Sequence, residues 1–264
     1  MVKKYERLKE YLSSMGSVAV AFSGGVDSTF LLKVAHDVLG DNAIAITEVT
    51  AVLPAREREE AETFCNDNGI KLVTVKTDVL KIEGFAENPY DRCYICKKAL
   101  FSQIKSTVEQ LGIKYVCEGS NTDDDSDYRP GMRAIAELGI KSPLKYAGLS
   151  KADIRALSKD MGLRTWDKPS FACLASRFVY GERITEEKLG MVEKAERLLH
   201  DMGFSQLRVR IHDRMARIEV KPEEFDKIIA ASDKINTYFR SLGFSYAALD
   251  LGGYKTGSMN IKVV

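Results

Sequence analysis

The sequence has no long hydrophobic run, and this absence excludes several classes of protein. Its longest apolar stretches are as short as Val18–Phe22, whereas a helix that spans a membrane needs about 20 apolar residues. The residues that follow Met1 lack the apolar core of a signal peptide. A bias in charge is also missing, because 39 basic and 38 acidic residues leave a net charge of +1. We therefore expect a cytoplasmic protein that binds neither a membrane nor nucleic acid through its overall charge.

Cysteine and histidine are both scarce, with five cysteines and three histidines in 264 residues. An odd cysteine count without a secretion signal argues against a disulfide framework and favours a metal, cluster or catalytic role. The histidines, His36, His200 and His212, are scattered along the chain, and we interpret them as surface or packing residues. The composition, 45% hydrophobic and 29% charged, is that of an ordinary soluble protein with a buried core.

The first part of the chain alternates short apolar strands with amphipathic helices. Strands are predicted at 17–22, 43–47, 70–76 and 115–118, and helices at 3–14, 28–39, 54–68, 97–111 and 129–138. This alternation is typical of an α/β fold, a parallel sheet with helices on both faces. A second group follows, with helices at 185–202, 222–231 and 235–242 and strands at 207–211, 216–220, 246–251 and 258–263. We predict an α/β domain at 1–168, an active-site loop and junction at 169–182, and a smaller α+β domain at 183–264 for substrate binding or oligomerisation.

A glycine turn joins the first predicted strand to the helix that follows it. Its sequence is Ser23-Gly24-Gly25-Val26-Asp27-Ser28. Glycine allows the backbone to turn with its N–H groups exposed, the helix N-terminus adds partial positive charge, and the serine hydroxyls donate hydrogen bonds. The chain has no Gly-Lys dipeptide and no Gly-x-Gly-x-x-Gly after a strand, so neither common nucleotide loop is present. We predict a polyphosphate site here, the alternative being a tight turn without a ligand.

Polar residues also follow the fourth predicted strand, within the segment 118–131. Four aspartates occupy positions 123, 124, 125 and 127. Because the carboxyl ends of parallel strands meet at one sheet edge, we expect this segment to lie beside the glycine turn. Asn121 and Asp123 are candidates for binding a ribose or a metal, and Asp27 for binding Mg²⁺, which prefers oxygen ligands. The alternative is a solvated acidic loop that caps the next helix.

Three of the five cysteines lie in segments typical of functional sites. Cys93 and Cys96 form a Cys-x-x-Cys pair before a helix, and Cys173 lies in the irregular segment. The pair alone is compatible with zinc, redox or cluster chemistry. Three thiolates without a nearby histidine favour a [4Fe–4S] cluster with one open iron over a closed zinc site. Cys65 and Cys117, in a predicted helix and a buried strand, are interpreted as packing residues.

The glycine turn resembles the SGGxDS signature of the ATP pyrophosphatase, or PP-loop, superfamily, which has an adenine nucleotide alpha hydrolase-like fold. Its members convert ATP to AMP and pyrophosphate while activating a carbonyl or carboxylate. The resemblance implies that ATP and Mg²⁺ bind at the turn, Ser23, Gly24, Gly25, Val26, Asp27 and Ser28. It also implies that the adenine lies at the end of the second strand, near Thr47.

Four further segments, 88–97, 118–121, 127–131 and 168–177, make the resemblance narrower. Together they are similar to the LarE branch of the superfamily, over essentially the whole chain. LarE proteins transfer sulfur to pyridinium-3,5-biscarboxylic acid mononucleotide, for the nickel-pincer nucleotide cofactor of lactate racemase. Some members have only the cysteine that corresponds to Cys173 and sacrifice its sulfur. This chain has all three, so it resembles the branch in which Cys93, Cys96 and Cys173 hold a [4Fe–4S] cluster.

The resemblance implies two chemical steps. Transfer of AMP to a substrate carboxylate releases pyrophosphate at the glycine turn, and a sulfide on the open iron then displaces AMP to give a thiocarboxylate. Cys173, Asp27 and Arg177 are the expected catalytic residues. Sulfide or a sulfur donor protein would supply the sulfur, and we expect a homo-oligomer.

The phosphate of the small-molecule substrate requires a second cationic site. Alternation along the strand at 207–211 places Arg208 and Arg210 on one face, and Arg214 is a further candidate. The alternative is a basic face exposed to solvent. A PP-loop tRNA thiolase, an ammonia-using synthetase and a nucleotide-binding module without catalysis remain as other functions.

Overall fold

The computed structural model describes residues 1–126, 130–169 and 172–255, and the chain divides into two compact units. The first unit comprises Met1–Asp78 and Asp91–Phe171, and the second comprises Val79–Tyr90 and Ala172–Val264. Residues 79–90, which we predicted within the first domain, therefore group with the C-terminal part of the chain. Asp127 and the strand predicted at 258–263 lie outside the described residues.

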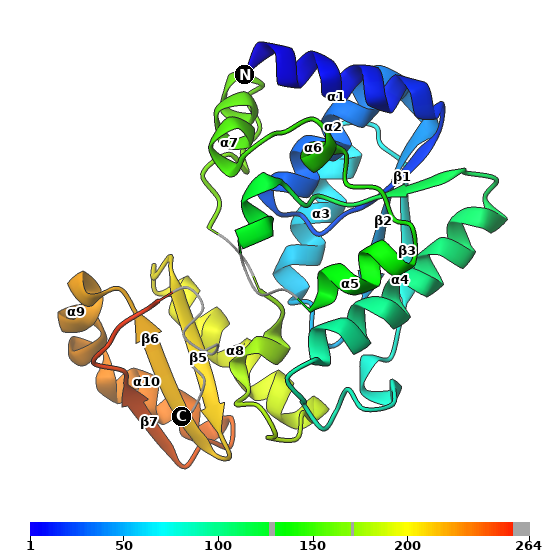
Figure 1. The fold of residues 1–264 in the computed structure, drawn as a ribbon. Helices are drawn as coiled ribbons and strands as arrows, with labels where there is room; N and C mark the ends of the chain where they lie inside the picture. The colour runs from blue at the N-terminus through cyan, green and yellow to red at the C-terminus, as the bar shows by residue number, and fades with distance from the viewer. Residues whose placement is uncertain (127–129, 170–171, 256–264) are drawn as a thin grey trace. The chain divides into compact units, whose positions relative to one another are not determined.

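The first unit is built on a four-stranded parallel sheet (Figure 1), which confirms the predicted α/β class. The strands are β1 (Val18–Ala21), β2 (Ala43–Val49), β3 (Leu72–Lys76) and β4 (Tyr115–Cys117), in the order β3-β2-β1-β4. The helices of this unit are α1 (Val2–Met15), α2 (Val26–Leu39), α3 (Ala55–Asp67), α4 (Arg92–Gln110), α5 (Gly131–Glu137), α6 (Pro143–Tyr146) and α7 (Lys151–Asp160). Short 3₁₀ turns occur at Gly40–Asn42 and Thr122–Ser126.

Each face of this sheet has its own hydrophobic core, because successive strand residues point to opposite faces. One core joins Val20 and Ala45 of the sheet to α1, α2, α3, α6 and α7. The other joins Ala19, Ile44 and Ile46 to α4 and α5. The central strands β1 and β2 are thus buried on both sides, and this explains why they are nearly continuous apolar runs in the sequence.

Two parts of the first unit differ from the predicted helices. Helix α4 begins at Arg92 instead of residue 97, because the Asp91 carbonyl accepts hydrogen bonds from the Tyr94 and Ile95 N–H groups, at 2.8 and 3.2 Å. The Cys-x-x-Cys pair therefore belongs to the first turn of the helix. Helix α7 was not predicted, although Ser150 and Asp153 form a capping box at its start. The Ser-x-x-Asp pattern is the sequence signal that would have located it.

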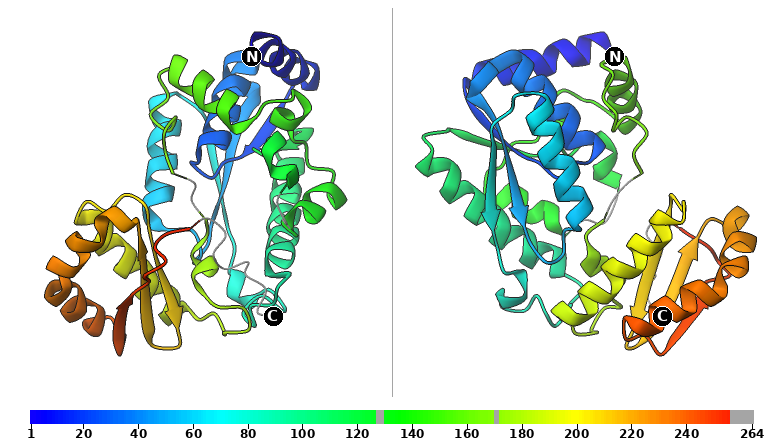
Figure 2. Two further views of the ribbon diagram at one scale, coloured as in Figure 1. Left: turned by 60° about the vertical axis from the view of Figure 1, so that its left-hand side comes forward. Right: turned by 180° about the vertical axis from the view of Figure 1, so that it is seen from behind.

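The second unit is a small α+β structure (Figure 2). Strands β5 (Leu207–His212) and β6 (Met215–Val220) are antiparallel, and β7 (Tyr246–Leu249) pairs in parallel with β6. Helix α8 (Glu186–Asp201) packs on β5 and α10 (Ser232–Ser241) on β7, while α9 is a short helix at Phe225–Ala230. Short 3₁₀ turns lie at Val79–Lys81, Leu174–Arg177 and Pro222–Glu224.

Candidate active site

The glycine turn joins β1 to α2 at the carboxyl edge of the first unit's sheet. Gly24 has a φ of +70°, and a Cβ atom there would lie 3.3 Å from the Glu57 carbonyl oxygen. The Ser28 hydroxyl accepts a hydrogen bond from the Ser23 N–H at 3.3 Å and lies 3.1 Å from the Ser23 hydroxyl. Gly25 is the N-cap, Val26 is buried, and no side chain caps the start of α2. The turn therefore has the form that an anion-binding helix N-terminus requires.

The loop after β4 lies directly against this turn, as the sequence predicted. A Cβ atom on Gly119 would lie 3.0 Å from the Ser28 nitrogen, so the two backbones approach as closely as glycine allows. The Asn121 amide nitrogen is 3.5 Å from Asp27 Oδ1, and the Asn121 side-chain oxygen accepts from the Asp123 N–H at 2.9 Å. The structure thus brings Asp27, Asn121 and Asp123 together.

A lysine that we did not predict completes this group. Lys151 Nζ lies 2.5 Å from Asp27 Oδ2, and the Lys151 N–H donates to Asp123 Oδ2 at 3.0 Å. Lys151 is the first residue of α7, so Asp123 of the acidic loop accepts a hydrogen bond from the first turn of this helix. The ammonium group of Lys151 also balances the charge of the Asp27 carboxylate.

A second lysine contacts the glycine turn itself. Lys168 Nζ donates to the Gly24 carbonyl oxygen at 3.1 Å and lies 2.7 Å from a carboxylate oxygen of Glu57 and of Glu60. Burial acts to raise the pKa of Glu60, but the hydrogen bonds from Lys168 and Arg56 outweigh it and hold that pKa below its usual value. Lys168 opens the Lys168–Arg177 motif, and only its contacts reveal a role at the turn.

The structure places Thr47, the predicted adenine contact, inside strand β2. The strand continues to Val49, and the Thr47 side chain is 3% exposed within it. The next residue, Glu48, points to the opposite face. Glu48 Oε1 is buried and has no hydrogen-bond partner within the described chain, and burial raises the pKa of this carboxyl to about 8.

The first turn of α4 carries Cys93 and Cys96, both half-buried. Their spacing places them on one face of the helix. A Cβ atom on Gly131 would lie 2.6 Å from Lys97 Cδ, so the start of α5 packs tightly against this turn. The Tyr94 hydroxyl donates to Glu137 of α5 at 2.8 Å, which holds the same turn in place. Cys65 and Cys117 are buried, and burial raises the pKa of each thiol to about 12, in agreement with a packing role.

Cys173 is exposed and belongs to the second unit, so neither unit by itself contains all three predicted cluster ligands. Arg177 is fully buried behind it. The Arg177 guanidinium forms two hydrogen bonds to Glu196, at 2.9 and 2.8 Å, and donates to the carbonyl oxygens of Ala172 and Cys173 at 2.6 and 3.2 Å. Arg177 therefore positions the backbone around Cys173, and this differs from the catalytic contact that we predicted for it.

Arg208 and Arg210 lie on one face of β5, as alternation predicted, but the face is not open to solvent. Their exposed fractions are only 8% and 5%. Arg210 forms hydrogen bonds with Glu219 at 3.1 and 3.0 Å and donates to the Ser176 carbonyl at 2.7 Å. Burial, and then the neighbouring Arg177, lower the pKa of Arg208 from its usual value. Glu196 and Glu219 balance the charges of Arg177 and Arg210, and Arg208 adds a third buried cation beside them.

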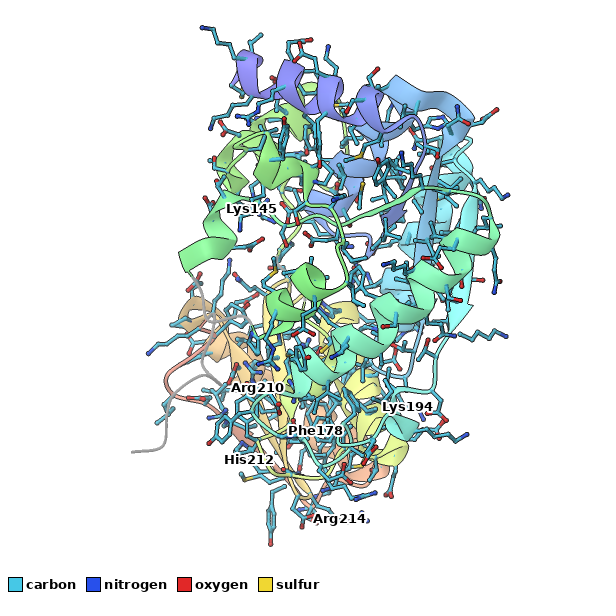
Figure 3. The ribbon with its side chains drawn as sticks, turned by 45° about the vertical axis from the view of Figure 1, so that its right-hand side comes forward. Lys145, Phe178, Lys194, Arg210, His212 and Arg214 are labelled. Atoms are coloured by element: carbon cyan, nitrogen blue, oxygen red, sulfur yellow. The ribbon has the colours of Figure 1, made fainter. Side chains whose placement is uncertain are left out.

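Arg214 does not belong to this group. It lies in the turn between β5 and β6, and it is exposed near Glu187, at 3.5 Å (Figure 3). It also donates to the Gly243 carbonyl at 3.2 Å. The chain leaves the strand at His212, so the alternation that places Arg208 and Arg210 on one face does not extend to Arg214.

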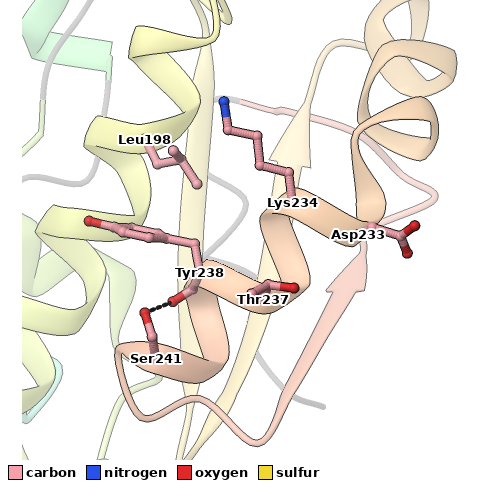
Figure 4. Close-up of a pocket in the computed structure, with 6 residues that line it drawn as sticks. All are labelled: Leu198, Asp233, Lys234, Thr237, Tyr238 and Ser241. Carbon is pink, nitrogen blue, oxygen red and sulfur yellow. Dashed lines mark hydrogen bonds between the residues drawn. The ribbon is translucent and has the colours of Figure 1, made fainter.

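A cavity of 490 Å³ lies between α8 and α10 of the second unit (Figure 4). It is lined by Leu198, Asp233, Lys234, Thr237, Tyr238 and Ser241. None of these residues is a predicted site residue, and the cavity contains no cysteine or arginine, so we assign it no part in the chemistry. Across the described chain, no helix combines the length and apolar character needed to cross a membrane, and no three His, Cys, Asp or Glu side chains form a ready-made metal site.

The chain matches no model of a protein family, but it is similar to individual proteins over nearly its full length. It is 42% identical over 260 residues to an uncharacterized protein of Synechocystis sp., and the match covers 97% of each chain. It is 36% identical over 261 residues to the pyridinium-3,5-bisthiocarboxylic acid mononucleotide synthase of Lactiplantibacillus plantarum, a match that covers 98% of this chain and 95% of the relative. It is also 26% identical, over 214 residues, to one component of the glutamine-hydrolyzing GMP synthase of Methanocaldococcus jannaschii, with 74% of this chain and 66% of the relative covered. The parallel sheet and the SGGxDS turn at its carboxyl edge agree with this similarity. The chain therefore belongs to the LarE family within the PP-loop superfamily.

Proposed function

We propose that this protein is an ATP-dependent sulfurtransferase that converts pyridinium-3,5-biscarboxylic acid mononucleotide to its thiocarboxylate, with release of AMP and pyrophosphate. The observation that carries this proposal is the 36% identity, over 98% of the chain, to a protein named as the synthase of the bisthiocarboxylic acid mononucleotide. The glycine turn, the cysteine trio and the buried arginine face are the parts that such a reaction needs.

The first step is activation of a carboxylate. A carboxylate is a poor electrophile, and transfer of AMP to it creates a mixed anhydride with a good leaving group. The turn at Ser23–Ser28 holds the departing pyrophosphate with its backbone N–H groups, and Lys168 adds positive charge at Gly24. The oxygen donors of Asp27 and Asp123 fit Mg²⁺, which when bound neutralises the triphosphate. Lys151 pairs with Asp27 and would have to share this carboxylate with the metal.

The second step is delivery of sulfur. Cys93 and Cys96 fit a [4Fe–4S] cluster as donors, because they share one face of a first helical turn, where the helix dipole favours thiolates. Cys173 would be the third ligand, and such a cluster would supply sulfide for the transfer. Arg177 holds the Cys173 backbone during this step. Arg208 and Arg210 bind the substrate's phosphate, because their charges are buried together on one strand face.

Three parts of the proposal concern partners. Sulfide or a sulfur donor protein reloads the open iron. The product supplies sulfur for the nickel-pincer nucleotide of lactate racemase. The protein assembles as a homo-oligomer, and the exposed apolar side chains of Tyr246 and Leu251, on and just after strand β7, support a contact between protomers there. Light scattering on the purified protein measures the number of protomers.

Anaerobic purification followed by iron and sulfide analysis tests the cluster. We expect about four irons and four sulfides per chain, and we expect both to be lost in Cys173→Ala. The matched control is Cys65→Ala, because Cys65 is a buried packing residue. Absence of iron, with zinc or nothing in its place, would make Cys173 the sulfur donor instead.

Separate assays of the two steps test the division of labour. Cys93→Ala or Cys96→Ala should abolish catalytic turnover yet leave AMP transfer to the substrate largely intact, whereas Asp27→Asn should lose both. Mass spectrometry of the product distinguishes a thiocarboxylate from the amide that an ammonia-using synthetase would form. An equal loss of AMP transfer in the cysteine variants contradicts this mechanism.

A further inference from the structure

We infer that Lys168 exchanges Glu60 for the polyphosphate of the bound nucleotide, so that occupancy of the glycine turn alters the surroundings of Trp166, two residues before this lysine. This inference rests on the proposed function, because it assumes that the turn binds ATP. It adds a residue that links nucleotide binding to the backbone around Trp166 within the first unit.

The first argument is the number of hydrogen-bond donors on the lysine. An ammonium group has three donors. In this structure they have three acceptors within reach, namely the Gly24 carbonyl and one carboxylate oxygen each of Glu57 and Glu60. To bind a phosphate oxygen at the turn, Lys168 must therefore release one of the three acceptors.

Glu60 is the acceptor that is easiest to release. Its other carboxylate oxygen already accepts from Arg56 at 2.8 Å, so Glu60 keeps a cationic partner after Lys168 leaves. Glu57 is buried and would lose the partner that compensates its burial. Lys168 thus retains Glu57 and exchanges Glu60.

The second argument is charge. Glu57 and Glu60 place two carboxylates around Lys168, beside a turn that receives a triphosphate. Like charges at this separation repel each other strongly where solvent is partly excluded. A lysine that turns from Glu60 toward the phosphates offsets this repulsion and adds a charge-assisted hydrogen bond.

The third argument is the way the neighbouring backbone is held. Arg155 of α7 donates to the Trp166 and Lys168 carbonyl oxygens at 2.6 and 2.8 Å, and Lys159 lies over the Trp166 ring at 4.7 Å. Movement of the Lys168 side chain therefore acts on a short, anchored segment that contains Trp166.

Trp166 makes the inference measurable, because it is the single tryptophan of the chain. Pyrophosphate and α,β-methylene-ATP, each with Mg²⁺, are titrated into the intact protein while Trp166 fluorescence and its quenching by acrylamide are recorded. We expect both probes to change the signal. Lys168→Met should weaken pyrophosphate binding roughly ten- to a hundredfold, the loss of one or two charge-assisted hydrogen bonds, and Lys168→Arg should restore much of it.

The pyrophosphate affinity of Glu60→Gln distinguishes a lysine that exchanges partners from a lysine with a purely structural role. This variant replaces the competing carboxylate by a neutral amide, whose oxygen is a weaker acceptor for Lys168, so it should tighten pyrophosphate binding several-fold, and this gain should disappear in the Lys168→Met background. Lys145→Met, at an exposed lysine on α6 (Figure 3), is the charge-matched control and should change nothing.

The outcomes separate the inference from the proposed function. If the wild type binds both probes but Glu60→Gln binds no tighter, or binds tighter without Lys168, the inference is wrong and the proposed function stands. If the wild type binds neither probe, both are wrong. Should Lys168→Met fail to fold, as circular dichroism would show, Lys168→Gln takes its place, and the gain from Glu60→Gln should disappear in that background.

Discussion

Replacing Glu48 by glutamine should stabilise the first unit, and the gain should grow with pH. Glu48 Oε1 is buried without a hydrogen-bond partner in the described part of the chain, and burial raises the pKa of the carboxyl from 4.5 to about 8. In the folded protein this group stays protonated at neutral pH, whereas in the unfolded chain it ionises. The unfolded state thus binds fewer protons between these two values, and stability falls as the pH rises through this window.

The size of the effect follows from the two pKa values. Each pH unit inside the window costs about 1.4 kcal/mol of the free energy of unfolding. For Glu48 this gives a cost of about 1 kcal/mol at pH ~5 and about 3 kcal/mol at pH ~7. Glu48→Gln is neutral at every pH and has nearly the same shape. The variant should therefore exceed the wild type in stability by about 2 kcal/mol more at the higher pH.

Urea unfolding at the two pH values measures this difference. Trp166 lies in the first unit, so its fluorescence follows the unfolding of the unit that contains Glu48. Glu59→Gln, at an exposed glutamate on α3, is the matched control and should give the same small difference at both pH values. A gain for Glu48→Gln that does not depend on pH would refute the reasoning, because it would mean that Glu48 ionises in the folded protein as it does in the unfolded chain.

Three further predictions concern stability and nucleotide binding. Arg177→Met should lower the free energy of unfolding by about 3–5 kcal/mol, because it leaves Glu196 buried without its cation; the double variant with Glu196→Met should lose less than the sum, measured by urea unfolding. Gly119→Ala places a Cβ atom 3.0 Å from the Ser28 nitrogen. This variant should lower the free energy of unfolding by about 1–3 kcal/mol and weaken α,β-methylene-ATP binding, measured by calorimetry. The control Gly190→Ala, whose Cβ atom would have no atom within 4 Å, should do neither. Hydrogen bonds from Lys4 and from the Ser150 backbone lower the pKa of Asp153 to about 2. The Asp153 carboxylate therefore stabilises the native state at pH values above the pKa that it has in the unfolded chain. Asp153→Asn should cost about 1 kcal/mol of the free energy of unfolding at neutral pH, and acid unfolding should show this cost vanish as the pH approaches ~2.

The sequence was informative wherever the relevant interaction is local. The period of the apolar residues located the strands of the parallel sheet, and the turn at Ser23–Ser28 was readable because its glycines act within a few residues of each other. The Cys93–Cys96 pair was visible for the same reason, although the start of α4 was misplaced. Helix α7 was not predicted, although the Ser150–Asp153 capping box is a local signal that marks its start.

Contacts between distant segments were decided only by the tertiary structure. Lys151 and Asp27 are 124 positions apart, and Lys168 and Gly24 are 144 apart, so no spacing rule connects them. Alternation predicted the shared face of Arg208 and Arg210, but not that this face is buried. By itself, then, the sequence determined the strands of the parallel sheet, the glycine turn and the Cys-x-x-Cys pair, since these depend on neighbours in the chain. The tertiary structure decided which charges meet and which are removed from water, because burial and pairing arise only when separate elements pack together.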